Sequence, residues 1–291
     1  MPKAPLRGVI AAIATPIDND GTPDFSLFAD HAEQLFDEGC DALNVLGTTG
    51  EAVSFSLDQR LGLMGQARAR FTKGKMMVGT GAAAVDDAVR LTRAAGELGF
   101  EAALVLPPFY YKSVPDDGIL RYFEAIAEAS QSTDIPLYLY NFPALSGVAY
   151  TKPLVEKLKA AFGTRIAGLK DSSGDMAYAR SLADIADFRV FPSNEACLLD
   201  AHRGEFAGCI SATANVNAAF CAKAFQTGDA AALATASEIR ALFDGRALVP
   251  AIKALVSHIR GLKPYVQTKP PLTDMAQGDL AKLVTTYKAV G

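Results

Sequence analysis

The chain has 291 residues, half of them hydrophobic, and a formal net charge of -4 at neutral pH. This length is sufficient for one large domain with a full core or for two small ones. The mildly acidic charge and the lack of a basic cluster argue against nucleic acid and anionic membranes as partners. No apolar run approaches the roughly 20 residues that span a bilayer, and segment 1–7 lacks the apolar core of a signal peptide. We therefore expect a cytoplasmic protein.

The cysteines and histidines give no sign of a metal centre or of a disulfide framework. The four cysteines are scattered without paired spacing, which is typical of small buried hydrophobic residues in a cytoplasmic protein. The three histidines likewise show no ligand spacing. The sequence therefore predicts neither a metal nor a cofactor.

Short apolar runs alternate with helical patterns along most of the chain. Asp24, for example, is expected to cap a helix that extends to about Glu38. The expected strands are 9–14, 42–46, 76–80, 102–106, 136–141, 165–170, 189–191 and 208–211. The helices between and after them are expected at about 24–38, 57–71, 85–98, 115–130, 151–161 and 176–186, and from about 196 and 216.

Eight strand–helix pairs with short links favour an α/β fold, a (β/α)8 TIM barrel. An open doubly wound sheet usually has fewer units, and no G-x-G-x-x-G follows the first strand. After residue 226 only helices are expected, at about 228–243, 246–260 and 275–289. We therefore predict a barrel domain over 1–226 that contains the active site, and a helical C-terminal extension over 227–291.

The stretch 165–175 is the one around which the chain is organised. An apolar run leads to Lys170 and is followed at once by Asp, Ser, Ser and Gly. This pattern predicts a buried strand that places one amine at its carboxyl end. An amine held partly out of water loses its charge more easily than a free lysine, and a neutral amine is a nucleophile towards ketones. The alternative is a lysine that simply reaches solvent from a strand end.

The polar residues at the other strand ends favour the first interpretation. Active sites of such barrels lie at the carboxyl ends of the strands. Those ends carry Gly47-Thr48-Thr49-Gly50-Glu51, Tyr110 and Tyr111, Tyr140-Asn141, Lys170, and Ile210-Ser211. This set is rich in hydroxyls and lacks a cluster of carboxylates, which disfavours two-carboxylate glycosidase chemistry and a magnesium site.

A lysine, tyrosines and threonines suit carbonyl chemistry through an imine. The amine condenses with a ketone, and Tyr140 could relay the protons. The hydroxyls of Thr48 and Thr49, with backbone N–H groups beside the glycines, could hold a carboxylate. Each element has a plainer interpretation: 47–50 as a tight turn alone, Tyr140 as a packing aromatic, and Glu51 as a cap of the next helix.

Several motifs together resemble the dihydrodipicolinate synthase / N-acetylneuraminate lyase family, and the resemblance covers essentially the whole chain. They are G-T-T-G-E, P-P-F-Y-Y, Y-N-F-P-A-L-S-G, G-L-K-D-S-S-G-D, I-S-A-T-A-N and K-P-P-L, in that order. The resemblance implies a (β/α)8 barrel with a C-terminal helical extension. It also implies action on pyruvate or another 2-oxo acid through a lysine Schiff base, in a homotetramer built as a dimer of dimers.

The resemblance further implies a role for individual residues. Lys170 matches the Schiff-base lysine, Tyr140 the proton-relay tyrosine, and Thr48 the threonine of a hydroxyl relay. Tyr110 matches a tyrosine that a neighbouring subunit contributes to that relay. Thr49 matches the residue that binds the substrate carboxylate, with Gly47 beside it. The backbone carbonyl of Ile210 matches a position that faces the lysine and the substrate.

The departures from the family pattern bear on the second substrate. Dihydrodipicolinate synthases resemble the pattern Y-N-x-P-x-R, whose arginine binds the carboxylate of the second substrate, aspartate semialdehyde. Leu145 stands at the position of that arginine, and leucine cannot form a bidentate contact with a carboxylate. Sialic acid lyases hold a polyol with a carboxylate pair and a serine, whereas this chain has Asn194, Glu195 and Ala212. Glu195 is thus a predicted substrate-binding residue.

We therefore predict a metal-independent class I lyase or aldolase that joins or releases a 2-oxo acid and an aldehyde, with a 2-keto-3-deoxy sugar acid as the leading substrate. The alternatives are dihydrodipicolinate synthase proper, which condenses pyruvate with aspartate semialdehyde, and a Schiff-base dehydratase of keto-deoxy sugar acids. An alternative of another class is a catalytically silent barrel that senses a 2-oxo acid. The retained lysine and tyrosines argue against it.

Overall fold

A computed structural model describes residues 5–262 and 265–290 of the chain. Its strands form one parallel sheet in the order β7-β6-β5-β4-β3-β2-β1-β8. They are β1 (Gly8–Ala12), β2 (Ala42–Val45), β3 (Met76–Gly79), β4 (Ala102–Val105), β5 (Leu137–Asn141), β6 (Ile166–Asp171), β7 (Arg189–Pro192) and β8 (Gly208–Ser211). The two end strands meet where the Ala207 N–H donates to the Val190 carbonyl at 3.0 Å. The sheet is thus a nearly closed barrel, and the predicted (β/α)8 fold is confirmed.

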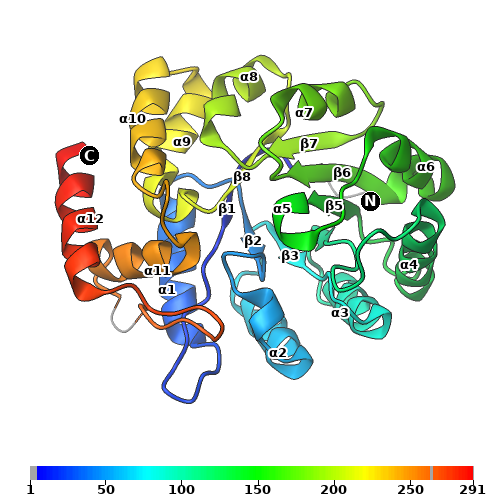
Figure 1. The fold of residues 1–291 in the computed structure, drawn as a ribbon, viewed down its shortest axis with the longest axis horizontal. Coiled ribbons are helices and arrows are strands. Elements are labelled where there is room, and N and C mark those ends of the chain that lie inside the picture. The colour runs from blue at the N-terminus through cyan, green and yellow to red at the C-terminus, as the bar shows by residue number, and fades with distance from the viewer. Residues whose placement is uncertain (1–4, 263–264, 291) are drawn as a thin grey trace.

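Helices surround this barrel (Figure 1). They are α1 (Phe25–Asp37), α2 (Leu57–Arg70), α3 (Val85–Glu97), α4 (Asp116–Ala129), α5 (Pro143–Ser146), α6 (Lys152–Phe162), α7 (Met176–Ala183), α8 (Leu198–Arg203) and α9 (Ala214–Thr227). The C-terminal helices α10 (Ala230–Ala241), α11 (Leu248–Ile259) and α12 (Gln277–Val290) lie together on one side, beside α1 and α9 (Figure 1). The boundary predicted between barrel and extension stays a prediction.

Side-chain caps explain where several helices begin. Asp24 accepts the Leu27 N–H at the start of α1, as predicted, and Asp175 accepts the Tyr178 N–H at the start of α7. At α2 the cap is Ser56, which exchanges hydrogen bonds with Gln59 in a capping box. Glu51 therefore does not cap this helix, and its carboxylate is available for another contact.

Strand β6 continues one residue beyond Lys170, where the sequence predicted its end. Asp171 pairs with Asn141 of β5 on one side and with Pro192 of β7 on the other. The Asn141 side-chain amide also donates to the Asp171 carboxylate at 2.8 Å. These cross-strand contacts extend the strand in spite of the low strand preference of aspartate.

The alternation of side chains along the strands separates two apolar layers. One fills the barrel interior and includes Ile10, Ala12, Met77, Leu104, Tyr138, Tyr140, Phe191 and Ile210. The other lies between the strands and the surrounding helices. The interior layer closes the barrel below its mouth, so that ligands have access to strand ends and not to a channel.

The C-terminal extension has its own apolar cluster, to which Val216 of α9, Ile252 and Leu255 of α11 and Tyr265 contribute. The Tyr265 hydroxyl donates to the carbonyl of Ala14, just after β1, at 2.7 Å. The extension therefore packs directly against the carboxyl end of the barrel.

The described residues also bear on the predictions from composition. All four cysteines are free and buried, as expected for small hydrophobic residues. No helix of the described part of the chain is long and apolar enough to cross a membrane. Within residues 5–262 and 265–290, no group of three or more His, Cys, Asp or Glu side chains is arranged to hold a metal ion.

Candidate active site

Lys170 lies near the carboxyl end of β6, and its side chain is directed towards Tyr140 on β5. The two residues are register partners on neighbouring parallel strands. Lys170 Nζ donates a hydrogen bond to the Tyr140 hydroxyl at 3.3 Å and lies 4.3 Å from the centroid of its ring. Lys170 is only 4% exposed, although no carboxylate forms an ion pair with it among the described residues. A buried amine in contact with one hydroxyl is available for chemistry.

Thr48 extends this contact into a chain of three polar groups. Its Oγ1 lies 3.1 Å from the Tyr140 hydroxyl, and either atom can be the donor. Thr48 comes from the turn after β2, so that three strand ends converge on the Tyr140 hydroxyl. A proton can pass along such a chain because each hydroxyl both donates and accepts. The structure thus brings Lys170, Tyr140 and Thr48 together, as the sequence predicted.

The turn that carries Thr48 and Thr49 has a constrained backbone. Leu46 before it and Glu51 at its end both have left-handed backbone angles, with φ of 54° and 53°. A Cβ on Gly47 would lie 2.5 Å from the side-chain nitrogen Nδ2 of Asn44, and a Cβ on Gly79 would lie 2.0 Å from the backbone carbonyl oxygen of Leu46. The turn therefore depends on close approaches that only glycine permits.

Thr49 and Gly47 occupy different surroundings within this turn. Thr49 is 4% exposed, whereas Gly47 lines a pocket together with Thr48. No hydrogen bond of the described residues joins the Thr49 side chain to Lys170 or Tyr140. The predicted carboxylate-binding roles of Thr49 and Gly47 stay predictions.

Thr48 and Tyr140 line a pocket of about 130 Å³. Its walls are mainly apolar and include Leu46, Val53, Leu104, Leu106, Phe109, Phe142 and Leu145. Arg60 also lines it and donates to the Gly79 and Gly81 carbonyls at 2.9 and 3.3 Å. Burial lowers the pKa of Arg60 to about 10. The sequence did not indicate that Arg60 of α2 would lie at the pocket, because its partners are backbone carbonyls at the end of β3, which no side-chain pattern reveals.

Tyr110 is not part of this group within one chain. It is 74% exposed and packs edge-to-face against the equally exposed Tyr111, with ring centroids 5.3 Å apart. Its predicted role requires a second copy of the chain and stays a prediction.

Ile210 is fully buried on β8, and its side chain belongs to the same interior cluster as that of Tyr140. The hydrogen bonds of the described residues do not join its carbonyl to Lys170. Its placement at the correct strand end is as expected, and its contact with substrate stays a prediction.

Asp171 follows the lysine and is stabilised by its neighbours. Burial raises the pKa of its carboxyl group, and hydrogen bonds from Asn141 and Ser173 oppose that rise. Its oxygens therefore serve to hold the ends of β5 and β6 together, and the Lys170–Tyr140 pair rests on this support.

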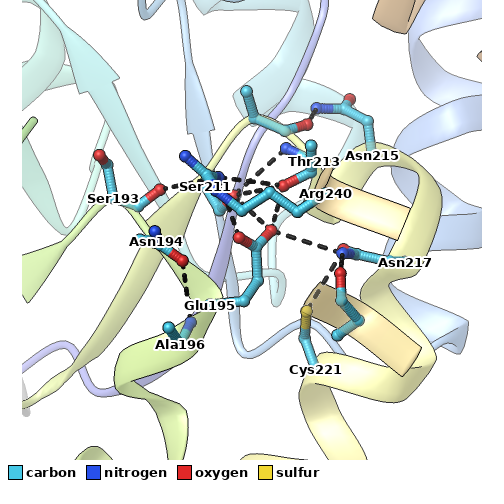
Figure 2. Close-up of polar contacts among 12 residues, drawn as sticks. Ser193, Asn194, Glu195, Ala196, Ser211, Thr213, Asn215, Asn217, Cys221 and Arg240 are labelled. Carbon is cyan, nitrogen blue, oxygen red and sulfur yellow. Dashed lines mark hydrogen bonds and ion pairs between the residues drawn. The ribbon is translucent and has the colours of Figure 1, made fainter. Parts of the chain in front are cut away.

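Glu195 follows β7, the neighbour of β6 in the barrel, and forms a separate polar cluster (Figure 2). It is fully buried, and Oε1 accepts hydrogen bonds from the hydroxyls of Ser211, at 2.7 Å, and of Thr213. Arg240, from α10, donates to Oε2 at 2.9 Å. The described contacts do not connect Glu195 with Lys170, and its oxygens are occupied by protein groups. Its predicted contact with substrate remains untested.

The comparisons with known proteins agree on one family. The model of the "Dihydrodipicolinate synthetase family" matches residues 5–290. An "uncharacterized DapA-like lyase" of Chloroflexus aurantiacus is 34% identical over 291 residues, which covers 98% of this chain and 97% of the relative. A 4-hydroxy-tetrahydrodipicolinate synthase of a Shewanella species is 31% identical over 243 residues, or 82% of this chain and 79% of the relative.

Solved structures support the same fold. YagE of Escherichia coli K12, a protein of the dihydrodipicolinic acid synthase family solved with pyruvate, superposes with a TM-score of 0.90 and is 26% identical, with 99% of each chain covered. CdNal of Clostridium difficile, solved with mannosamine, has a TM-score of 0.89 over 99% of this chain and all of that one. At 21% identity this second likeness concerns the fold alone.

Proposed function

This chain belongs to the dihydrodipicolinate synthetase family, and we propose that it is a class I lyase or aldolase that acts on pyruvate or another 2-oxo acid through an imine at Lys170. The observation that carries the proposal is the chain of contacts from Lys170 through Tyr140 to Thr48. The structural relative solved with pyruvate supports the choice of a 2-oxo acid.

The proposed reaction begins when Lys170 Nζ adds to the ketone carbon of the substrate. The carbinolamine loses water, with the proton supplied through Tyr140, and an iminium forms. In the cleavage direction the C4 hydroxyl gives its proton to Tyr140, the bond between C3 and C4 breaks, its electrons enter the enamine, and C4 leaves as an aldehyde. Protonation at C3 and hydrolysis then release the 2-oxo acid. The iminium accepts the electron pair, so this route needs no metal ion.

Tyr140 suits the proton transfers because its hydroxyl contacts the amine on one side and Thr48 on the other. The Thr49 hydroxyl and the N–H groups beside Gly47 are proposed to bind the substrate carboxylate. They belong to the turn whose first threonine contacts Tyr140, which would place the carboxylate next to the reacting ketone.

The second substrate is proposed to be a sugar aldehyde, with a 2-keto-3-deoxy sugar acid as the adduct. Leu145 lines the pocket and is 62% exposed, and it offers no charge to the carboxylate of aspartate semialdehyde. Dihydrodipicolinate synthase activity is the second candidate, favoured by the likeness to the 4-hydroxy-tetrahydrodipicolinate synthase of Shewanella. Dehydration of a keto-deoxy sugar acid is the remaining alternative, and it would proceed through the same imine.

Reductive trapping tests the imine. The protein is incubated with pyruvate and borohydride, and the adduct is mapped by mass spectrometry. We expect modification of Lys170, and an unmodified Lys170 in folded protein would exclude the mechanism. A trapped adduct without turnover of any aldehyde would instead favour the 2-oxo acid sensor.

A panel of aldehydes with pyruvate tests the second substrate. We expect sugar aldehydes to react faster than aspartate semialdehyde, because Leu145 cannot bind a carboxylate. Equal rates would overturn this interpretation of Leu145.

The protein is proposed to be a cytoplasmic homotetramer. In this assembly, Tyr110 of one copy is proposed to complete the hydroxyl relay in the active site of a neighbouring copy. The exposure of Tyr110 and Tyr111 supports a contact between copies. Light scattering measures the mass of the assembly. If the role is correct, Tyr110→Phe lowers the rate in an assembly of unchanged mass.

A further inference from the structure

Glu51 ends the turn that carries Thr48 and Thr49, and its backbone is in the left-handed region with φ of 53°. Leu46, at the start of the turn, is also left-handed. Residues with a Cβ adopt this conformation only where the surrounding structure imposes it. Within the turn, the Glu51 N–H donates to the Thr48 carbonyl at 3.0 Å, so the position of Glu51 and that of Thr48 are coupled.

The contacts that hold Glu51 come from the C-terminal extension. Lys253 of α11 donates from Nζ to Glu51 Oε1 at 2.6 Å, and the side chains of both residues are fully buried. The backbone N–H of Lys269 donates to Oε2 at 2.6 Å. Both oxygens of one carboxylate are therefore bound by segments more than two hundred residues away in the chain.

A completely buried ion pair is an unusual way to join a helix to a turn. Desolvation lowers the pKa of Lys253, and the charge of Glu51 opposes that effect. Apolar side chains of similar volume often stabilise a fold as well as a buried ion pair does. An ion pair adds direction, because a charged donor and acceptor fix the relative position of the two segments more tightly than apolar contact does.

We propose that Glu51 and Lys253 are positioning residues that hold the Thr48–Thr49 turn in the geometry needed to bind the substrate carboxylate. The inference rests on the proposed function, since it concerns the same 2-oxo acid site. The C-terminal extension then belongs to the active site by position, although it supplies no reacting group.

The test measures how the borohydride-trapped Lys170 adduct depends on pyruvate concentration. For Glu51→Gln we expect half-maximal trapping to need about tenfold more pyruvate, since small displacements of positioning groups have effects of this size or larger. The adduct formed at saturating pyruvate should stay close to that of the parent protein, because Lys170 and Tyr140 are not altered.

Glu38→Gln is the matched control. Glu38 forms a bidentate ion pair with Arg260, which also ties the extension to the barrel but at α1 and away from the turn. We expect this variant to lower the urea midpoint without changing the pyruvate dependence. If Glu38→Gln and Glu51→Gln shift the pyruvate dependence equally, the effect is one of general stability and the inference is wrong.

The double variant Glu51→Gln with Lys253→Met separates position from stability, because it leaves no unpaired buried charge. We expect it to recover the urea midpoint relative to Lys253→Met alone while still needing about tenfold more pyruvate. It also carries the test if Glu51→Gln does not fold.

Two outcomes separate this inference from the proposed function. A parent protein that forms no adduct would overturn the proposed function and this inference together. A parent adduct with unchanged half-saturation in the double variant would overturn the positioning role alone.

Discussion

The two sides of the barrel mouth use similar residues in opposite ways. On the side of β2, β5 and β6, Tyr140 and Thr48 share one hydrogen bond between them, and both residues line a pocket. On the side of β7 and β8, Ser211 and Thr213 both donate to the fully buried Glu195 (Figure 2). The first set keeps unused hydrogen-bonding capacity next to an amine. In the second set, both oxygens of the Glu195 carboxylate already accept hydrogen bonds from protein groups.

Residue type and strand position therefore do not by themselves show which polar groups already have partners within the protein. Glu195 lies after β7, where a substrate contact was predicted, yet its oxygens accept from two hydroxyls and from Arg240. A buried carboxylate with several donors contributes to the stability of the fold, because hydrogen bonds to a charged group are stronger than those to a neutral one. We therefore expect substitutions on the two sides to affect different measurements.

The largest effect is expected for Tyr140→Phe. Removal of the hydroxyl takes away the proton relay, and the rate of carbon–carbon bond cleavage or formation should fall by about 10²–10⁴-fold. Steady-state kinetics with pyruvate and the best aldehyde of the panel measures this.

Tyr138→Phe is the control for Tyr140→Phe, since Tyr138 is two residues earlier on the same strand and belongs to the same interior cluster. It should leave the rate unchanged. Similar rates for all three proteins would remove Tyr140 from the relay.

Glu195→Ala should act on stability instead. It removes the acceptor that Ser211, Thr213 and Arg240 share, and we expect the free energy of unfolding to fall by about 3 kcal/mol with little change in rate. Urea unfolding measures the loss.

Glu205→Ala is the control. It removes an exposed glutamate that forms ion pairs with Arg180 and Arg203, and it should change the free energy of unfolding by less than about 1 kcal/mol. A large rise in the KM of the aldehyde for Glu195→Ala would mean that Glu195 does contact substrate.

The pH dependence of stability is expected to come partly from His31, which supports the β8 side. Its Nε2 lies 2.9 Å from Asn215 Oδ1, and Asn215 Nδ2 donates to the carbonyl of Ala12. Burial, and then the charge of Arg260, lowers the pKa of His31 from 6.5 to about 3. Below about pH 6.5 His31 therefore binds a proton in the unfolded chain but not in the folded chain. The contribution of neutral His31 to the free energy of unfolding is complete above that pH and is lost as the pH falls towards 3.

His31→Gln tests this contribution. Between pH 7 and pH 5 the parent protein should lose about 2 kcal/mol more stability than the variant, because only the parent has a histidine that protonates on unfolding. Urea unfolding at the two pH values gives the difference. Equal losses would show that His31 does not set the acid limit.

The smallest and most direct test makes one substitution on each side. Thr48→Val should lower the rate about tenfold with little loss of stability, because it interrupts the relay beside the pocket. Thr213→Val should lower stability by about 1 kcal/mol with little effect on rate, because it removes one donor to Glu195. If both variants had the same phenotype, the distinction between the two sides would fail.

Sequence reasoning located Lys170, Tyr140 and Thr48 because parallel strands bring their carboxyl ends to one edge, so that a residue at a strand end has predictable neighbours. It ended β6 one residue early, because the pairing of Asp171 with Asn141 outweighs the local preference of aspartate. It did not find the Glu51–Lys253 or Glu195–Arg240 pairs, whose partners are 202 and 45 residues apart. The helical pattern of the extension indicates an apolar face, and it does not say which turn of the barrel that face will meet.

The amino-acid sequence by itself determined the eightfold alternation of strands and helices and the place of Lys170 at the mouth. Both follow from the local periodicity of apolar residues, which decides what is buried along each element. Only the tertiary structure decided which polar groups at the mouth remain available. That depends on how many partners each donor or acceptor meets in the folded chain: Glu51 and Glu195 are bound by charged groups from the C-terminal helices, whereas the Lys170 amine has a hydrogen bond to one hydroxyl.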